Sequence, residues 1–156
     1  MEKIETISDI QLAIKCELQK NTYFVTHGVD ILIENAKDIE FQIKNAMGSL
    51  GTVVTVSTPS LTYSGNLTGP ETDRKSPFWT LNSVQIVVVE NPTLNRGRAN
   101  YSTALDTALQ IAETLHQIPT LCNSSISQTT MNGLVIVTVT VKTTTVFELA
   151  KSEVNG

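Results

Sequence analysis

Apolar residues recur at the three- and four-residue spacing of an amphipathic helix in three segments of the chain. The first segment covers residues 7–19. The last covers residues 105–115, where Asn100 or Ser102 supplies an N-cap and Pro119 follows the end. Each stripe is suited to face a core, so both segments are predicted to be helices packed on one side.

The clearest helical pattern lies between these two segments. Asn35 and Asp38 resemble a capping arrangement at its start, and Gly48 and Gly51 are typical of a helix end. The apolar stripe of this helix consists of Ala36, Ile39, Ile43, Ala46 and Leu50.

Alternating and β-branched residues predict strands at 29–33, 52–56, 84–89 and 134–149. Residues 84–89 are apolar on both faces over most of their length, as expected of a central strand. Residues 134–149 place valines on one face and mainly threonines on the other. Leu61 and Tyr63 are candidates to extend the sheet.

The remaining segments are predicted to be connections. The longest is a loop at about residues 59–81, and the last ends at the turn signal Asn132-Gly133. The order of elements predicts one α/β domain over residues 1–156. We expect a mixed sheet of about four strands packed with two to three helices.

Composition narrows the class of protein. Charged residues make up 17% of the chain, against roughly 25% in typical proteins, and the net charge is −4. These values exclude a disordered charged tail and a nucleic-acid binder with a broad basic surface. No apolar segment has the length of a signal peptide core or of a membrane helix, so neither is expected. Cys16 and Cys122 are predicted to be reduced, partly buried thiols.

Catalytic and metal-binding patterns are missing from the sequence. It contains no glycine-rich phosphate loop, nucleophile motif or cysteine pair with metal-ligand spacing. His27 and His116 are the only histidines, and we interpret both as structural or solvent-facing. Asp38 and Glu40 lie two positions apart on a helix and do not face each other. We therefore expect no enzyme activity, no cofactor and no metal.

The long loop contains the first candidate interface. Arg74 and Lys75 stand beside Phe78 and Trp79, the only tryptophan. Aromatic residues with arginine are enriched at protein interfaces, and the acidity of the chain favours a protein partner over nucleic acid. Alternatively, Trp79 folds back on the sheet as a lid.

The second candidate interface is Arg96-Gly97-Arg98, between a predicted strand and a predicted helix. These two arginines could contact an acidic neighbouring subunit or nucleic-acid phosphates. A solvated loop is the alternative interpretation.

Several short segments resemble small structural proteins of tailed phages. They are IENAKDIE at residues 33–40, Gly51 with the β segment to Pro59, VENP at residues 89–92, and Asn95-Arg96. The pattern, spread over about residues 25–115, is most similar to the tail terminator, or tail-completion, family.

The resemblance implies a virion protein assembled in the host cytoplasm. It would form a homo-oligomeric ring, hexameric by analogy, that ends the tail tube and joins it to the neck. Its partners would be the tail tube protein and a neck or head–tail connector protein, with DNA only passing through the lumen and no membrane contact. The family has no catalytic residues, so none is carried over.

The charge deficit is concentrated in the β segments, mainly residues 52–63, 84–89 and 134–149. The last predicted strand carries only Lys142 between Ile136 and Val146, so it could pair with another chain. A different class of function also fits the sequence, namely a stand-alone small-molecule or peptide-binding α/β module.

Overall fold

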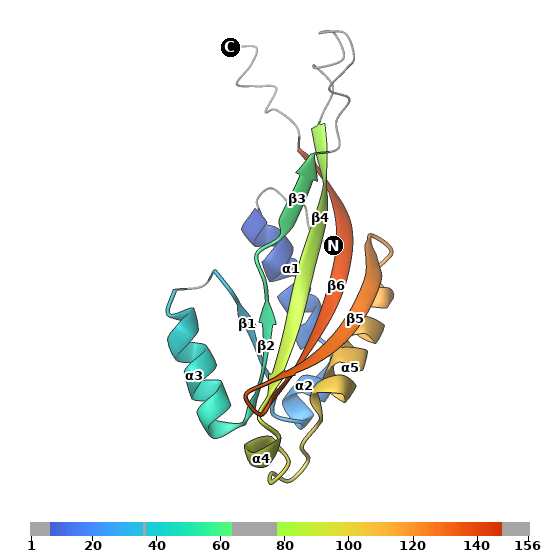
Figure 1. Cartoon of the computed structure of the whole chain (residues 1–156). Helices are drawn as coiled ribbons and strands as arrows, with labels where there is room; N and C mark the ends of the chain where they lie inside the picture. Colours follow the sequence, from blue (N-terminus) through green and yellow to red (C-terminus); the bar gives the residue numbers. More distant parts are fainter. Residues whose placement is uncertain (1–6, 36, 64–77, 148–156) are drawn as a thin grey trace, which may run out of the picture.

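The computed structural model describes residues 7–35, 37–63 and 78–147 (Figure 1). The described helices are α1 (Ile7–Gln19), α2 (Thr22–Thr26), α3 (Ile39–Ser49), α4 (Pro92–Asn95) and α5 (Ala104–His116). The described strands are β1 (Asp30–Ile33), β2 (Thr52–Val56), β3 (Ser60–Tyr63), β4 (Phe78–Glu90), β5 (Leu121–Met131) and β6 (Leu134–Phe147).

The strands form a single six-stranded sheet in the order β1-β2-β4-β6-β5, and β3 pairs with β4 next to β2. Among the described strands, β1 and β2 are parallel and every other neighbouring pair is antiparallel. The predicted fold class, a small α/β domain with a mixed sheet, is confirmed. The strand count is higher than the predicted four, and the described part of the chain includes two short helices, α2 and α4, that were not expected.

The core lies between one face of the sheet and the helices α1 and α5. From the helices, Ile10, Ile14 and Leu18 of α1 and Ile111 and Leu115 of α5 are almost fully buried. The sheet contributes Val54, Val56, Val84, Ile86, Val88, Val137, Val139 and Val141. The apolar stripe of α1 and the valine face of the last strand therefore form this core as predicted. In α5 the prediction is only partly confirmed, because Ala108 and Leu115 of the expected stripe are buried but Leu105 and Leu109 are exposed. Cys16 and Cys122, which are predicted to be partly buried, are exposed.

Helix α3 packs against β1 and β2, at the left of the sheet in Figure 1. Val53, which points away from α1, is fully buried there. On the same side, Thr138 and Thr140 of β6 are partly exposed and Gln85 of β4 is exposed. The second face of the sheet is thus covered mainly at the β1 and β2 end.

The caps of two helices differ from the predicted ones. Helix α3 begins only at Ile39, because Asp38 adopts a left-handed conformation (φ 64°) and gives no side-chain cap. The capping arrangement predicted at Asn35 is therefore wrong. In α5 the N-cap is Thr103, whose hydroxyl accepts from the Asp106 N–H, rather than Asn100 or Ser102.

Segments predicted to be loops contain strands. Part of the segment at about 59–81 forms β3 and the start of β4, while residues 64–77 lie outside the described residues. The last predicted loop is wrong over most of its length, because it forms β5. The turn at Asn132-Gly133 is confirmed, with φ of 52° and 80°, and it joins β5 to β6 as a long hairpin.

None of the helices in the described ranges is long and apolar enough to cross a membrane.

Candidate interaction surface

Glu90 organises a polar cluster at the end of β4. Its side chain is fully buried and accepts hydrogen bonds from Asn95 Nδ2 (2.6 Å), the Ala104 N–H (3.2 Å) and Arg96 Nε and Nη2 (both 3.3 Å). Pro92 begins the short helix α4 directly after the strand, and this turn brings Asn95 and Arg96 back to the carboxylate.

The environment of Glu90 keeps it ionised at neutral pH. Burial alone would raise the pKa of this carboxyl. The hydrogen bonds from Arg96, Asn95 and the Ala104 N–H act in the opposite direction and hold its pKa below the usual value. The same contact raises the pKa of Arg96. Glu90 therefore acts as a buried anion that holds α4 and the start of α5 together.

Arg98 extends this cluster toward α2. Its Nη2 donates to Asn95 Oδ1 (2.7 Å) and to the backbone oxygen of His27 (3.2 Å). The His27 ring is hydrogen bonded through Nδ1 to the Asn100 backbone oxygen (2.7 Å), and the Tyr23 and Ser102 hydroxyls are bonded to each other. The loop before α5 is thus tied to α2 by several side chains.

The structure describes four of the six predicted interface residues, and these four lie in two separate regions. Arg96 and Arg98 donate to groups of their own chain, although the Arg96 side chain keeps 48% of its surface exposed. Phe78 and Trp79 begin β4, opposite Phe147 and Val146 of β6. Arg74 and Lys75 lie outside the described residues. An interface role for these residues stays a prediction.

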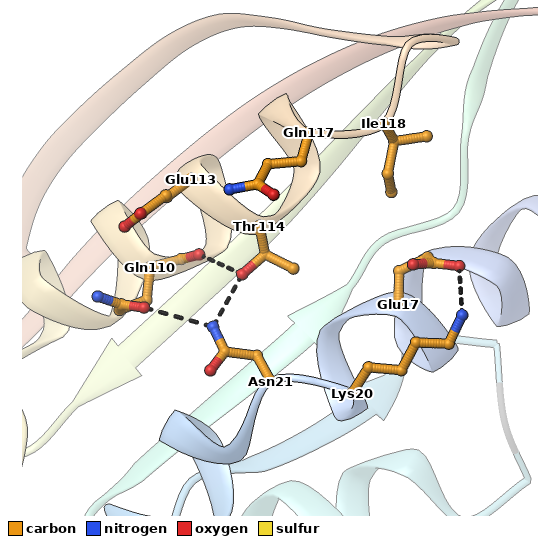
Figure 2. Close-up of a pocket in the computed structure, with 8 residues that line it drawn as sticks. All are labelled: Glu17, Lys20, Asn21, Gln110, Glu113, Thr114, Gln117 and Ile118. Carbon is orange, nitrogen blue, oxygen red and sulfur yellow. Dashed lines mark hydrogen bonds and ion pairs between the residues drawn. The ribbon is translucent and has the colours of Figure 1, made fainter.

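A polar hollow of about 370 Å³ lies between the end of α1 and α5 (Figure 2). Several of its lining side chains form hydrogen bonds with one another. Asn21 Nδ2 donates to Thr114 Oγ1 (2.9 Å) and to Gln110 Oε1 (3.3 Å). Lys20 forms an ion pair with Glu17 at 2.9 Å. The hollow is open to solvent and lined mostly by polar groups, unlike the apolar, enclosed pockets that hold small molecules.

A second open hollow, of about 320 Å³, lies where the loop before α5 meets α2. Tyr23, His27, Ser102 and Asp106 line it together with Tyr101 and Leu109. His27 and Ser102 already take part in the hydrogen bonds that connect this loop to α2.

Among the described residues, no group of three or more His, Cys, Asp or Glu side chains could hold a metal ion.

The edge of the sheet at β5, unlike the Glu90 cluster, contains no charged residues. No charged residue occurs between residues 117 and 141, which include all of β5 and its turn. Residues 125–131 are exposed and pair regularly with β6, after an irregularity between Asn123 and Ser125. Soluble monomers usually protect long edge strands with lysine, proline or a cover. Beyond the early irregularity, β5 uses no such protection along its sequence.

The sequence indicated the last strand as the one that could pair with another chain, but this prediction is wrong, because β6 is paired on both sides, with β4 and with β5. The true edge strand β5 was missed because its serine, threonine and asparagine residues were interpreted as a loop. The signal that could have found it is the uncharged run on both sides of Asn132-Gly133, which is typical of a hairpin.

Comparison of the chain with protein-family models and with curated proteins finds no match to either.

Proposed function

We propose that this chain is a virion structural protein whose subunits form a ring that ends the tail tube and joins the tail to the neck. The observation that carries the proposal is the long, uncharged and exposed edge at β5. An edge of this kind presents unpaired backbone donors and acceptors, which another strand can pair. In a subunit whose β5 edge is covered by a neighbouring subunit, that edge needs no charged or bulky residue to prevent unwanted strand pairing.

The Glu90 cluster supports the same proposal. A buried carboxylate held by Asn95, Arg96 and a backbone N–H stiffens the loop between β4 and α5 without leaving a reactive group exposed. Glu90 lies within residues 89–92, and these residues, with Asn95 and Arg96, are among the segments that resemble the tail terminator family. These features favour a rigid building block over an enzyme.

The partners follow from this role. The ring, hexameric by analogy with the family, would contact the tail tube protein on one side and a neck or connector protein on the other. DNA would only pass through its lumen, in keeping with a chain of net charge −4 that lacks a broad basic surface.

A peptide-binding module is the second candidate function, and the β5 edge is also the observation that favours it. An extended peptide from another protein can add to an exposed edge strand through its backbone. The two hollows give less support to a small-molecule site, because they are open and their polar groups bond one another.

Light scattering after size-exclusion chromatography, together with negative-stain imaging, tests the proposal. We expect annular particles, either from the protein alone at high concentration or at the ends of tail tubes added to it. A protein that stays monomeric and forms no annular particle with or without tubes would contradict the ring and favour the binding module.

A further inference from the structure

We propose that β5 of one subunit pairs with β1 of the next, so that the sheet continues from subunit to subunit. This inference rests on the ring proposed above and assigns the contact that closes it. The two strands are the opposite ends of the sheet order β1-β2-β4-β6-β5.

The registers of the sheet show which residues would meet. One row of aliphatic residues crosses the whole sheet on the face covered by α1 and α5. It runs through Ile33, Val56, Ile86, Val139 and Ile126, each paired with the next. The row begins on β1 and ends on β5, where Ile126 remains 40% exposed. A neighbouring sheet at the same height would place its Ile33 beside this Ile126.

The strand directions agree with such a contact. β1 is parallel to β2, and β2 is antiparallel to β4. β5 is antiparallel to β6, which is antiparallel to β4, so β5 runs with β4 and against β1. Subunits of a ring are related by rotation about its axis and keep the same orientation. β5 and the β1 of the next subunit would therefore meet as an antiparallel pair.

The same register places Thr129 of one subunit opposite Asp30 of the next, since both belong to the row through Val53, Val89 and Ile136. Asp30 is the only charged residue of β1, and Thr129 can donate its hydroxyl proton to that carboxylate. Both residues are exposed in the single subunit. Because β5 carries no charge, the contact contains no like-charge pair.

Cysteine cross-linking tests this register. In a background with Cys16→Ser and Cys122→Ser, the double variant Asp30→Cys with Thr129→Cys is oxidised gently and analysed on a denaturing gel. Directly opposite residues of an antiparallel pair have Cβ atoms about 4.5–5.5 Å apart, close to the span of a disulfide. We expect a ladder of covalent oligomers that ends at the size of the ring.

The matched control is Asp30→Cys with Thr130→Cys, because Thr130 is also exposed but points to the other face of the sheet. It should give no ladder, and thermal melting of the reduced variants should resemble that of the wild type. The single variant Thr129→Cys should remain monomeric on the gel.

Three results would overturn the inference. If the control variant gave covalent oligomers in equal yield, the cross-links would come from non-specific collisions between subunits. A covalent dimer from a single cysteine on β5, such as Thr129→Cys, would indicate a two-fold β5–β5 contact. Annular particles that form normally without any ladder would place the subunit contact elsewhere and leave the proposed function intact. A protein that forms no annular particle under any condition would instead contradict the proposed function itself.

Discussion

The Glu90 cluster and the β5 edge differ in whether their polar groups are paired within the chain. At the end of β4, a fully buried carboxylate is met by Arg96, Asn95 and a backbone N–H, so its charge is used inside the subunit. At the edge of the sheet, residues 125–131 carry no charge and expose a regular strand with no neighbour beyond it in the described sheet. The polar groups of the first region are paired within the chain, whereas the second region ends the described sheet.

Cations in a loop of this sequence are thus not necessarily free of partners within their own chain. The sequence indicates Arg96 and Arg98 as interface candidates, because cations in a loop can contact a partner. In the structure they are tied to Glu90, Asn95 and His27. The uncharged strand β5 is instead one of the two end strands of the described sheet order, where an edge strand presents backbone groups that another strand can pair.

The largest effect on stability is expected from Glu90→Ala. The change leaves the buried Ala104 N–H without an acceptor and removes the partner of Arg96, so unfolding should become easier by about 2–4 kcal/mol. Denaturant titration measures this. The control Glu113→Ala removes an exposed carboxylate of α5 and should change stability by less than about 0.5 kcal/mol. Equal effects of the two variants would contradict a special role for Glu90.

The pH dependence of stability should show the lowered pKa of Glu90. The unfolded chain protonates this carboxyl near its ordinary pKa of 4.5, whereas the folded chain does so only at lower pH. The stabilisation of the folded chain by ionised Glu90 is therefore complete above the ordinary pKa of 4.5. It is lost as the pH falls below 4.5 and through the lowered pKa of the folded chain. The difference in unfolding free energy between the wild type and Glu90→Gln should shrink over this range. A difference that stays constant with pH would show that Glu90 is not ionised in the folded chain.

A smaller effect is expected from Arg96→Gln. The guanidinium is about half exposed, so solvent screens its ion pair with Glu90, and we expect a smaller loss of stability than for Glu90→Ala. Part of this loss should disappear at high salt, which denaturant titrations at two ionic strengths can measure. If the variant keeps its stability but no longer assembles, Arg96 acts at an interface, as the sequence predicted.

The smallest effect on stability is expected from Ile126→Lys. Ile126 is 40% exposed at the edge, so the free energy of unfolding of the subunit should change by about 1 kcal/mol or less. A charge on this edge should nevertheless weaken self-association strongly, which light scattering detects. Gln85→Lys adds the same charge to an exposed position of the central strand β4 and should leave association unchanged. An Ile126→Lys protein that assembles like the wild type would show that the edge is not the contact.

Much of the fold could be predicted, because local pattern and burial agree there. Ile10, Ile14 and Leu18 recur at helical spacing and all lie in the core. The alternation of Val137, Val139 and Val141 likewise identified β6 and its buried face. The start of α3 was harder, since the left-handed conformation of Asp38 breaks an otherwise good capping pattern.

The two functional regions could not be predicted in the same way. The bond between Glu90 and Arg96 depends on the turn at Pro92 and on the burial that α5 provides, and neither is visible in the residue types. β5 lacks a local apolar alternation, and it becomes a strand by pairing with β6. Its place at the end of the sheet is a property of the strand order alone.

The sequence by itself determined the fold class, the two core helices, the hairpin turn at Asn132-Gly133 and the absence of charge around it. Only the tertiary structure decided that Arg96 and Arg98 form hydrogen bonds within their own subunit. It also decided that the uncharged strand β5 lies at the end of the sheet. The physical reason is that periodicity and turn chemistry act between near neighbours in the chain. Pairing of a buried charge and exposure of a strand edge depend instead on which distant segments meet.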